Sequence, residues 1–287
     1  MARALRRAAG ATAALGAIVG LLVLAPGAEA QSWRTVTTSR QLAGEESLDV
    51  EVSYGAGRFR VAPAEPGLLY RMQLRYDEEA FEPVNEYRGG RLRLGTEGNG
   101  EGISLGRGRT EGELDLRLTR AVPMHLRLRF GAVRADLDLG GLSLTDLELS
   151  TGASESRIDV SEPNPVAMRR AELEVGAAEF TARHLGNLNA ERIEIDAGVG
   201  EVTLEFTGEW RRDAAVTVDL GLGALELRFP EGLGVKLEKD SFLTSLDAQR
   251  MVKRDDAYYS LGWDEAKRRI TVSVDAALGS VNVAWVR

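Results

Sequence analysis

Short segments in which apolar and polar residues alternate recur along most of the chain, and a small-residue hinge joins many of them in pairs. The segment at 196–206 reads DAGVGEVTLEF, and the one at 219–229 reads DLGLGALELRF. Apolar residues at every second position are typical of half-buried β-strands, because successive side chains of a strand point to opposite faces. The pattern therefore predicts pairs of strands that meet at a glycine-containing corner.

The hinges recur at a nearly constant interval. Those that begin at residues 131, 152, 176, 198 and 221 are 21, 24, 22 and 23 residues apart. A unit of about 22 residues cannot bury its apolar face alone and must stack on its neighbours. We therefore expect an all-β fold, a single-stranded right-handed parallel β-helix (a solenoid) with capping strands at both ends. A β-sandwich of hairpins is the alternative, because G-x-G also suits hairpin turns.

The two ends of the chain depart from this repeat. Residues 31–120 are expected to form a β-rich cap region, and residues 121–287 the repeat region, together one continuous domain over 33–287. Glycine is frequent at 95–112, which predicts a mobile loop. Only 245–253 has a pattern that allows a short helical turn. Strands are expected in the cap region at 47–53, 58–61, 69–76, 91–94 and 113–118.

The segment at 230–274 interrupts the repeat and holds three aromatic residues, Tyr258, Tyr259 and Trp263. Large side chains that cover an open solenoid end are the simplest interpretation. Exposed loops and aromatic side chains are also common contact sites. The three aromatic residues are therefore the candidate interaction surface, together with the loop at 95–112.

The first 30 residues have the composition of an export signal. Arg3, Arg6 and Arg7 precede an uncharged run, and a small-residue site ends at Ala30. The strongly apolar part, 11–24, is shorter than the about 20 residues that a spanning helix needs. Cleavage near Ala30 is therefore favoured over a retained anchor. We expect an exported protein, periplasmic or extracellular at the cell surface, without a transmembrane segment in the mature chain.

The chain has no cysteine and a net charge of −8. Removal of the leader takes away three Arg and one Glu, which leaves 33 basic and 43 acidic residues and a net charge of −10. The absence of cysteine excludes acylation at a lipobox and disulfide stapling. An acidic protein is a poor binder of nucleic acid or anionic lipid, so nucleic acid is not an expected partner.

Two stretches carry a resemblance to a known family. Residues 54–94 combine a strand that ends in G-x-G, a strand that ends in Tyr76, then Pro83-Val84 and a closing strand. Near the other end, Tyr259-Ser260 precedes an alternating strand and a final GSVNV. These features resemble the toast-rack domains, which are β-helical and occur in bacterial putative-adhesin proteins and in cell-wall stress regulators of the LiaF type.

The resemblance implies a β-helical fold and a role in surface adhesion or envelope-stress signalling through protein contacts. It implies no catalytic residues. LiaF-type regulators carry several N-terminal spanning helices, whereas this chain has only a leader, which argues against direct control of a membrane kinase.

The residues themselves offer little catalytic chemistry. A strand pattern follows Gly198-Val199-Gly200, whereas a dinucleotide loop needs a helix there. His125 and His184 lack the spacing of zinc ligands. Neither a cofactor nor a metal is expected, and the chain is not expected to be an enzyme.

Ten acidic residues occupy positions that are expected to fall into stacked outward rows. Arg residues are interspersed among them, so we interpret the rows as a solvated face; a Ca²⁺ or glycan site is the alternative, and catalysis is the least favoured. The ten are Asp136, Asp138, Asp159, Glu174, Glu194, Asp196, Glu205, Asp219, Glu226 and Asp275.

The sequence therefore predicts an exported, non-catalytic β-helical protein that acts by surface interaction, in adhesion or in envelope stress sensing. Its partner is expected to be an envelope protein or a surface glycan. A glycan-binding or polysaccharide-active β-helix is the alternative, since clustered carboxylates on one solenoid face can serve such chemistry. Regulation of a partner at the membrane face is a third hypothesis.

Overall fold

The computed structural model describes residues 32–98 and 112–286. The predicted leader and residues 99–111 of the predicted loop lie outside this part of the chain. Ser32–Arg287 form one compact unit. Within the described residues, no helix is both long and apolar enough to cross a membrane.

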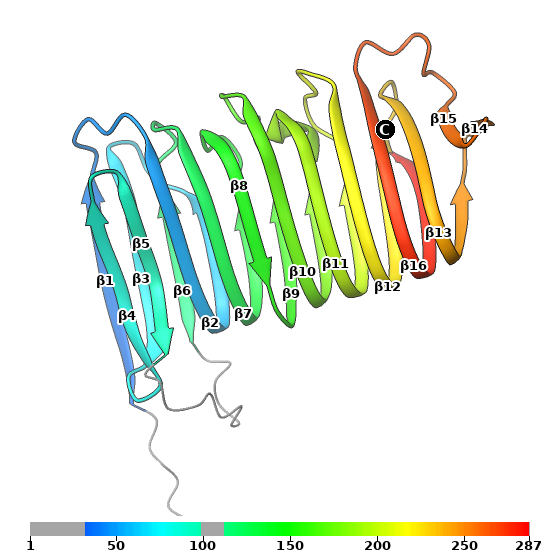
Figure 1. Ribbon diagram of the computed structural model, residues 1–287. Coiled ribbons are helices and arrows are strands. Elements are labelled where there is room, and N and C mark those ends of the chain that lie inside the picture. Colours follow the sequence, from blue (N-terminus) through cyan, green and yellow to red (C-terminus); the bar gives the residue numbers. More distant parts are fainter. Residues whose placement is uncertain (1–31, 99–111, 287) are drawn as a thin grey trace, which may run out of the picture. The chain divides into compact units, whose positions relative to one another are not determined.

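In the described part of the chain, sixteen strands join one continuous sheet (Figure 1). The 3-10 helix η2 (Leu185–Leu188) lies between β10 and β11. The strands are β1 (Trp33–Gln41), β2 (Leu48–Pro63), β3 (Leu68–Asp77), β4 (Phe81–Arg88), β5 (Arg91–Gly98), β6 (Glu113–Leu118), β7 (Met124–Asp138), β8 (Leu144–Thr151), β9 (Ser154–Asp159), β10 (Met168–Arg183), β11 (Ala190–Glu205), β12 (Ala214–Pro230), β13 (Gly234–Ala248), β14 (Met251–Arg254), β15 (Ala257–Ser260) and β16 (Arg269–Val286).

The long strands stack in parallel and in register, so that equivalent residues form columns with a spacing of about 4.8 Å. The inward columns are apolar and buried, as the alternation predicts. One such column consists of Val50, Leu126, Leu147, Ala171, Ile193, Val216, Val272 and Leu237. The all-β prediction is confirmed. The hairpin sandwich is wrong, because neighbouring repeats pair in parallel and a sandwich of hairpins needs antiparallel pairs.

The hinges form corners at which a long strand bends and continues in the same ladder (Figure 1). Gly223 and Gly279 have φ angles of 148° and 143°, which residues with a side chain rarely adopt. A Cβ on Gly223 would overlap the carbonyl oxygen of Gly200, and one on Gly279 would overlap that of Gly223. Glycine satisfies both demands because it has no Cβ. The predicted structural role of these hinges is confirmed.

The spatial order of the strands departs from the chain order at both ends. β2 pairs with β5 and β6 on one side and with β7 on the other. At the other end, β16 lies between β12 and β13 and pairs in parallel with both. Antiparallel strands complete the two ends: β1, β3 and β4 at one, β14 and β15 at the other. The chain therefore does not form a simple solenoid, in which each coil stacks on the preceding one, over its whole length.

Loops close the third side of the stack, and buried asparagines tie neighbouring loops together. The amide of Asn164 donates to the carbonyl oxygens of Leu144 (2.8 Å) and Leu188 (3.0 Å), and it accepts from the Leu144 N–H. Asn187 donates to the carbonyl oxygen of Val160 at 2.7 Å. Both side chains are buried. They form hydrogen bonds with backbone groups of the loops that have no partner in a strand ladder.

The predicted helical turn at 245–253 is wrong. Ser245–Ala248 belong to β13 and pair with Ser280–Val283 of β16, and β14 begins at Met251. Pairing with a neighbouring strand satisfies every second backbone group of this segment. That gain outweighs the weak helical pattern of its residues.

Candidate functional site

The three aromatic residues singled out from the sequence lie together at the end formed by β13, β14 and β15, but they have different roles. Tyr258 and Tyr259 are consecutive in β15 and therefore point to opposite faces of the strand. Tyr258 packs against the core, as an end cap should. Tyr259 instead contacts Trp263, with ring centroids 5.2 Å apart and the rings tilted by 76°. The predicted cap and the predicted contact surface are thus two adjacent features.

Hydrogen bonds hold the turn that carries Trp263. The Trp263 N–H donates to the carbonyl oxygen of Ser260 at 3.1 Å, and the Ser260 hydroxyl accepts from the N–H of Val235 at 3.0 Å. The guanidinium of Arg269 donates to the carbonyl oxygens of Trp263 and Asp264, both at 3.1 Å. The aromatic pair is therefore fixed relative to β13 and β16.

A cation lies near each ring of the cluster. The guanidinium carbon of Arg254 is 5.4 Å from the ring centroid of Tyr259, and that of Arg269 is 5.6 Å from the ring centroid of Trp263. Arg254 also pairs with Asp264 at 3.3 Å. Aromatic faces, cations and a carboxylate in one place can contact apolar and polar groups of a partner at once. We define the aromatic cluster as Tyr259, Trp263, Arg254, Asp264 and Arg269.

A shallow depression lies next to the aromatic cluster. Its volume is about 230 Å³, and Leu261, Arg250, Glu231 and Trp285 are among its lining residues. Leu261 is 65% exposed, and Arg250 pairs with Glu231 at 3.1 Å. The depression therefore extends the cluster with an apolar side chain and an ion pair.

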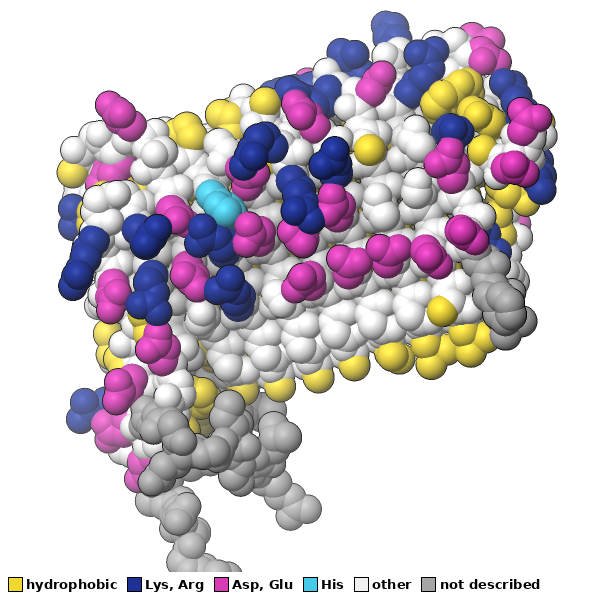
Figure 2. All heavy atoms as spheres, viewed as in Figure 1, with side chains coloured by type: hydrophobic (Ala, Val, Ile, Leu, Met, Phe, Trp, Pro, Cys, Tyr) yellow, Lys and Arg dark blue, Asp and Glu magenta, His cyan; other side chains and the backbone are white. Residues whose placement is uncertain are grey.

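The predicted acidic rows are real ladders, and one of them is uninterrupted. Figure 2 shows a straight row of acidic side chains across one face of the stack. Every member is exposed. We call it the acidic row, and it consists of Glu174, Asp196, Asp219, Asp275 and Asp240. The prediction that Arg interrupts the acidic residues fails for this row, because its four strand-to-strand pairs are all acidic.

Repulsion within the acidic row affects its central member. Partial burial raises the pKa of Asp219, a hydrogen bond to Asp196 raises it further, and the charges of Asp196 and Asp275 add to the effect. In the described part of the chain, no group of three or more acidic or His side chains is placed to hold a metal ion.

The other predicted acidic residues lie in mixed ladders. Asp159 pairs in register with Arg183, and Glu205 with Arg228. Asp136 faces Arg157 across the ladder, and Glu194 pairs with Arg170. This arrangement is a solvated face with charges of both signs, as the sequence predicts.

The two histidines lie in different parts of the stack, each beside a carboxylate. The Nε2 of His125 is 3.0 Å from Glu148 Oε1, and the Nδ1 of His184 is 2.6 Å from Asp159 Oδ1. His184 lies just before η2 with a φ angle of 54° and is partly exposed. Its closest polar contact is thus a carboxylate at the surface, in keeping with the prediction of a surface residue.

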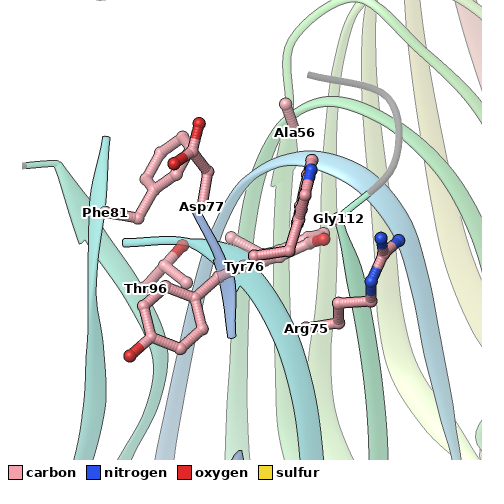
Figure 3. A pocket seen from close by; sticks show the side chains of 9 residues that line it. Ala56, Arg75, Tyr76, Asp77, Phe81, Thr96 and Gly112 are labelled. Carbon is pink, nitrogen blue, oxygen red and sulfur yellow. The ribbon is translucent and has the colours of Figure 1, made fainter. Parts of the chain in front are cut away.

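A small apolar pocket lies at the other end of the stack, between β2, β3, β4 and β5 (Figure 3). Its lining includes Tyr76, Phe81, Thr96 and Ala56. Its volume of about 10 Å³ corresponds to about one water molecule. The nearby Tyr54 hydroxyl is buried without a hydrogen-bond partner among the described residues, and burial raises the pKa of Tyr54. The pocket is too small for an organic ligand.

The corners are predicted from the sequence as structural turns, and the exposure of their middle residues was not predicted. Val199, Leu222 and Leu278 are 51%, 44% and 46% exposed, and they are register-matched neighbours. Each lies three positions after a member of the acidic row. The recurrence of a bulky apolar residue between two small ones, as in Gly198-Val199-Gly200, Gly221-Leu222-Gly223 and Ala277-Leu278-Gly279, is the sequence signal that could have revealed this line.

One family model matches most of the chain. It is described as the N-terminal domain of toast_rack, DUF2154, and it matches residues 28–183 and 170–228. The comparison with curated proteins gives no match.

Several solved structures are similar over most of their length. A "putative cell adhesion protein" from Clostridium sporogenes is 17% identical, with 89% of this chain and 100% of that chain covered and a TM-score of 0.48. A "putative adhesin" from Bacteroides fragilis is 12% identical, with 87% and 97% covered and a TM-score of 0.37. A "putative lipid binding protein" from Parabacteroides distasonis is 9% identical, with 88% and 97% covered and a TM-score of 0.32.

Proposed function

The chain belongs to the family of the N-terminal domain of toast_rack, and on that basis we propose that it is an exported, non-catalytic protein that acts through contacts on its surface. The family resemblance implies adhesion or envelope stress sensing and regulation as the setting. The partner is then an envelope protein or a surface glycan. This function needs a rigid scaffold with exposed contact residues rather than a reactive centre.

The aromatic cluster is the observation that carries the proposal. Tyr258 of β15 covers the core, whereas Tyr259 and Trp263 contact each other beside two guanidinium groups. Aromatic residues and Arg are the side chains most enriched at binding hot spots. Because hydrogen bonds already fix the Trp263 turn, little conformational entropy is lost when a partner binds there.

Export is part of the same proposal. The leader composition at 1–30 supports it, and the protein would then act in the periplasm or at the cell surface. We also infer the finer description of the fold, a single-stranded right-handed parallel β-helix, for the middle of the stack. The parallel ladders from β7 to β12 support it, and the strand order at the two ends limits it to that region.

A binding experiment with the envelope of the native host tests the proposal. The purified full chain is incubated with envelope fractions, and the retained protein is measured after washing. Replacement of Tyr259 or Trp263 by Ala is expected to lower retention about fivefold or more. Tyr87→Ala is the matched control, because Tyr87 is also a partly buried tyrosine with a guanidinium, that of Arg40, 4.0 Å from its ring centroid.

Two results would contradict the proposal. The first is wild-type protein that is not retained by the envelope at all. The second is retention that falls equally in the Tyr87→Ala control, since the aromatic cluster would then have no special role.

Glycan binding or glycan turnover is the second candidate function, and the aromatic cluster with its adjacent depression favours it. Sugar rings combine apolar C–H faces with hydroxyl groups, which matches Trp263, Leu261 and the ion pair of Arg250 with Glu231. Binding to a panel of envelope polysaccharides tests it. Polysaccharide turnover that disappears in Glu231→Gln or Asp264→Asn would replace the non-catalytic proposal by an enzymatic one.

A further inference from the structure

We propose that the corner line of Val199, Leu222 and Leu278, together with the acidic row beside it, is a docking surface for a basic amphipathic helix of a partner protein. This docking surface rests on the proposed function, because it assigns a surface and a class of partner to a protein that is proposed to act through surface contacts. It goes beyond the aromatic cluster, which lies at the end of the stack. We call the three corner residues the corner ridge.

The side chains of the corner ridge are exposed, whereas most apolar side chains of the described residues are buried. Its three side chains are 44% to 51% exposed, and they follow one another at the strand spacing of about 4.8 Å. Figure 2 shows hydrophobic side chains in a line along the lower edge of the stack, with the row of acidic side chains parallel to them. A line of exposed apolar side chains bordered by charge is typical of an interaction site.

The fold itself does not require bulky apolar residues at these corners. At the equivalent positions of β7 and β10 the chain has Ala132 and Ala177, both exposed, and Ala177 pairs in register with Val199. Alanine is therefore compatible with this corner. The larger side chains of the corner ridge add apolar surface that the fold leaves in water.

Every strand of the corner ridge also belongs to the acidic row. β11, β12 and β16 each contribute one acidic and one apolar residue, as in Asp219 and Leu222. On β7, where the corner residue is Ala132, the position of the acidic row is taken by Arg129. On β10 the acidic row continues with Glu174 although the corner residue is Ala177. The two features therefore coincide on β11, β12 and β16, and both are absent from β7.

Charge and spacing identify the occupant. Five adjacent carboxylates attract a cationic surface and disfavour an acidic one. Apolar residues three or four positions apart on a helix lie about 5–6 Å from each other, close to the spacing of the corner ridge, whereas same-face residues of a strand lie about 7 Å apart. A helix with an apolar stripe flanked by Lys or Arg fits both rows.

A second copy of this chain and a membrane fit less well. A two-fold contact through the corner ridge would bring two acidic rows close together, and like charges at an interface are unfavourable. Anionic lipid headgroups would be repelled by the acidic row in the same way.

The test uses a synthetic helical peptide that carries Leu on one stripe and Lys on both flanks, with binding to the full chain measured by fluorescence anisotropy. A peptide of the same composition with a scrambled order keeps the charge and loses the stripe. We expect the striped peptide to bind at least about tenfold more tightly than the scrambled one. Added salt is expected to weaken binding without abolishing it.

Variants locate the contact. The triple change Val199→Ala, Leu222→Ala and Leu278→Ala is expected to weaken binding about tenfold or more, and Asp196→Asn with Asp275→Asn is expected to weaken it severalfold. Val252→Ala is the apolar control, because Val252 is 43% exposed and lies outside the corner ridge. Glu65→Gln is the charge control, since Glu65 is exposed at the other end of the chain.

Several outcomes would overturn the proposal. Equal affinity for the striped and scrambled peptides would reduce the contact to non-specific charge attraction. Unchanged affinity in the triple variant, with its melting temperature also unchanged, would place the contact elsewhere. A third outcome is that the wild-type chain does not bind the striped peptide but self-associates, as measured by light scattering, or binds neutral lipid vesicles. If the triple variant loses that self-association or vesicle binding, the corner ridge is assigned to a second copy or to a membrane.

The envelope retention experiment separates this proposal from the proposed function. If the triple variant is retained as well as the wild-type chain while Trp263→Ala is not, the corner-ridge proposal fails and the proposed function stands. If the wild-type chain is not retained and still binds the striped peptide through the corner ridge, the proposed function fails and the docking surface stands.

Discussion

Gly223 illustrates how a single residue in the corner determines whether two strands can approach each other. Its φ angle is 148°, and a Cβ would overlap the carbonyl oxygen of Gly200 in the neighbouring strand. Neither atom can move, because both belong to paired backbone. The close approach and the backbone conformation therefore both exclude a side chain.

Replacement of Gly223 by Ala is expected to destabilise the protein by about 3 kcal/mol or more. Gly232→Ala separates the two causes, because Gly232 has a φ angle of 88° and no other atom lies within 4 Å of the place a Cβ would take. That control is expected to cost only about 1–2 kcal/mol, the penalty of the left-handed conformation. Urea unfolding of both variants measures the difference, and equal losses would contradict the role of the close approach.

Asp219 is the residue of the acidic row at which repulsion between neighbouring carboxylates is expected to lower the stability of the fold. Its pKa is raised by partial burial and by its neighbours, so the folded state holds its proton more strongly than the unfolded state. Such a group favours the folded state at low pH. This contribution to stability is lost as the pH rises from the pKa of Asp219 in the unfolded state, about 4, through its raised pKa in the folded state. The contribution is absent at neutral pH.

Asp219→Asn is therefore expected to stabilise the protein at pH 7 by a few tenths to about 1 kcal/mol, the range of exposed charge interactions. The advantage should shrink as the pH falls toward about 4, where the wild-type carboxyl is also neutral. Thermal unfolding across pH measures it, with Asp256→Asn, an exposed residue outside the acidic row, as control. A loss of stability in Asp219→Asn at pH 7 would contradict the predicted repulsion.

Among the elements, β16 has the most consequential position. It pairs with β12 from Ile270 to Val286 on one side and with β13 from Arg269 to Val283 on the other. Its inward side chains, which include Val272, Val274 and Val281, are buried. Without it, β12 and β13 would each present an unpaired edge and an open core.

A chain that ends after Arg268 is thus expected to lose cooperative thermal unfolding and to aggregate. The matched control ends after Trp285 and lacks only two residues, so it should keep nearly all of the pairing of β16. Circular dichroism during heating, together with size-exclusion chromatography, distinguishes the two chains. A shortened chain that melts like the control would show that β16 is dispensable.

The same elements show what could be predicted from the sequence. Alternation and the regular interval of the hinges predict the strands and corners from β7 to β12, because each depends on local pattern and on stacking of one repeat on the next. The position of β16 could not be predicted. β13 and β16 have similar alternation, and no local signal determines which of two such strands lies nearer to β12.

The candidate surfaces were predictable to different degrees. The sequence indicates that Tyr258, Tyr259 and Trp263 belong together, but only the structure separates the core-facing Tyr258 from the other two. The acidic row was partly predicted. Asp240 was missed because the corner that follows it has no glycine, so its strand was not recognised as a member of the repeat.

The molecule as a whole has a gradient of pairing from its middle to its ends. Among the described strands, β11, β12 and β16 pair with a strand on both sides, whereas β1, β4 and β14 each pair with one neighbour only. In a stacked array, each element is stabilised mainly by its nearest neighbours. The end strands are therefore expected to open more often than the middle ones.

Hydrogen exchange followed by mass spectrometry is expected to show this gradient. Amides of β11, β12 and β16 should exchange about a hundredfold or more slowly than those of β1, β4 and β14. The unusual element of this prediction is β16, since it follows β13, β14 and β15 in the chain but lies between β12 and β13 in the sheet. Rapid exchange in β16, or uniform protection over all strands, would contradict the observed pairing order.

The central position of β16 also has a consequence for how the protein is made. Chains fold from the N-terminus as they are synthesised, and the strand that joins β12 to β13 is made after both of them. This part of the stack therefore cannot close until β16 has left the ribosome. A product that terminates before β16 would display the unpaired edges of β12 and β13 to cellular proteases. The late synthesis of β16 thus delays the closure of this part of the stack.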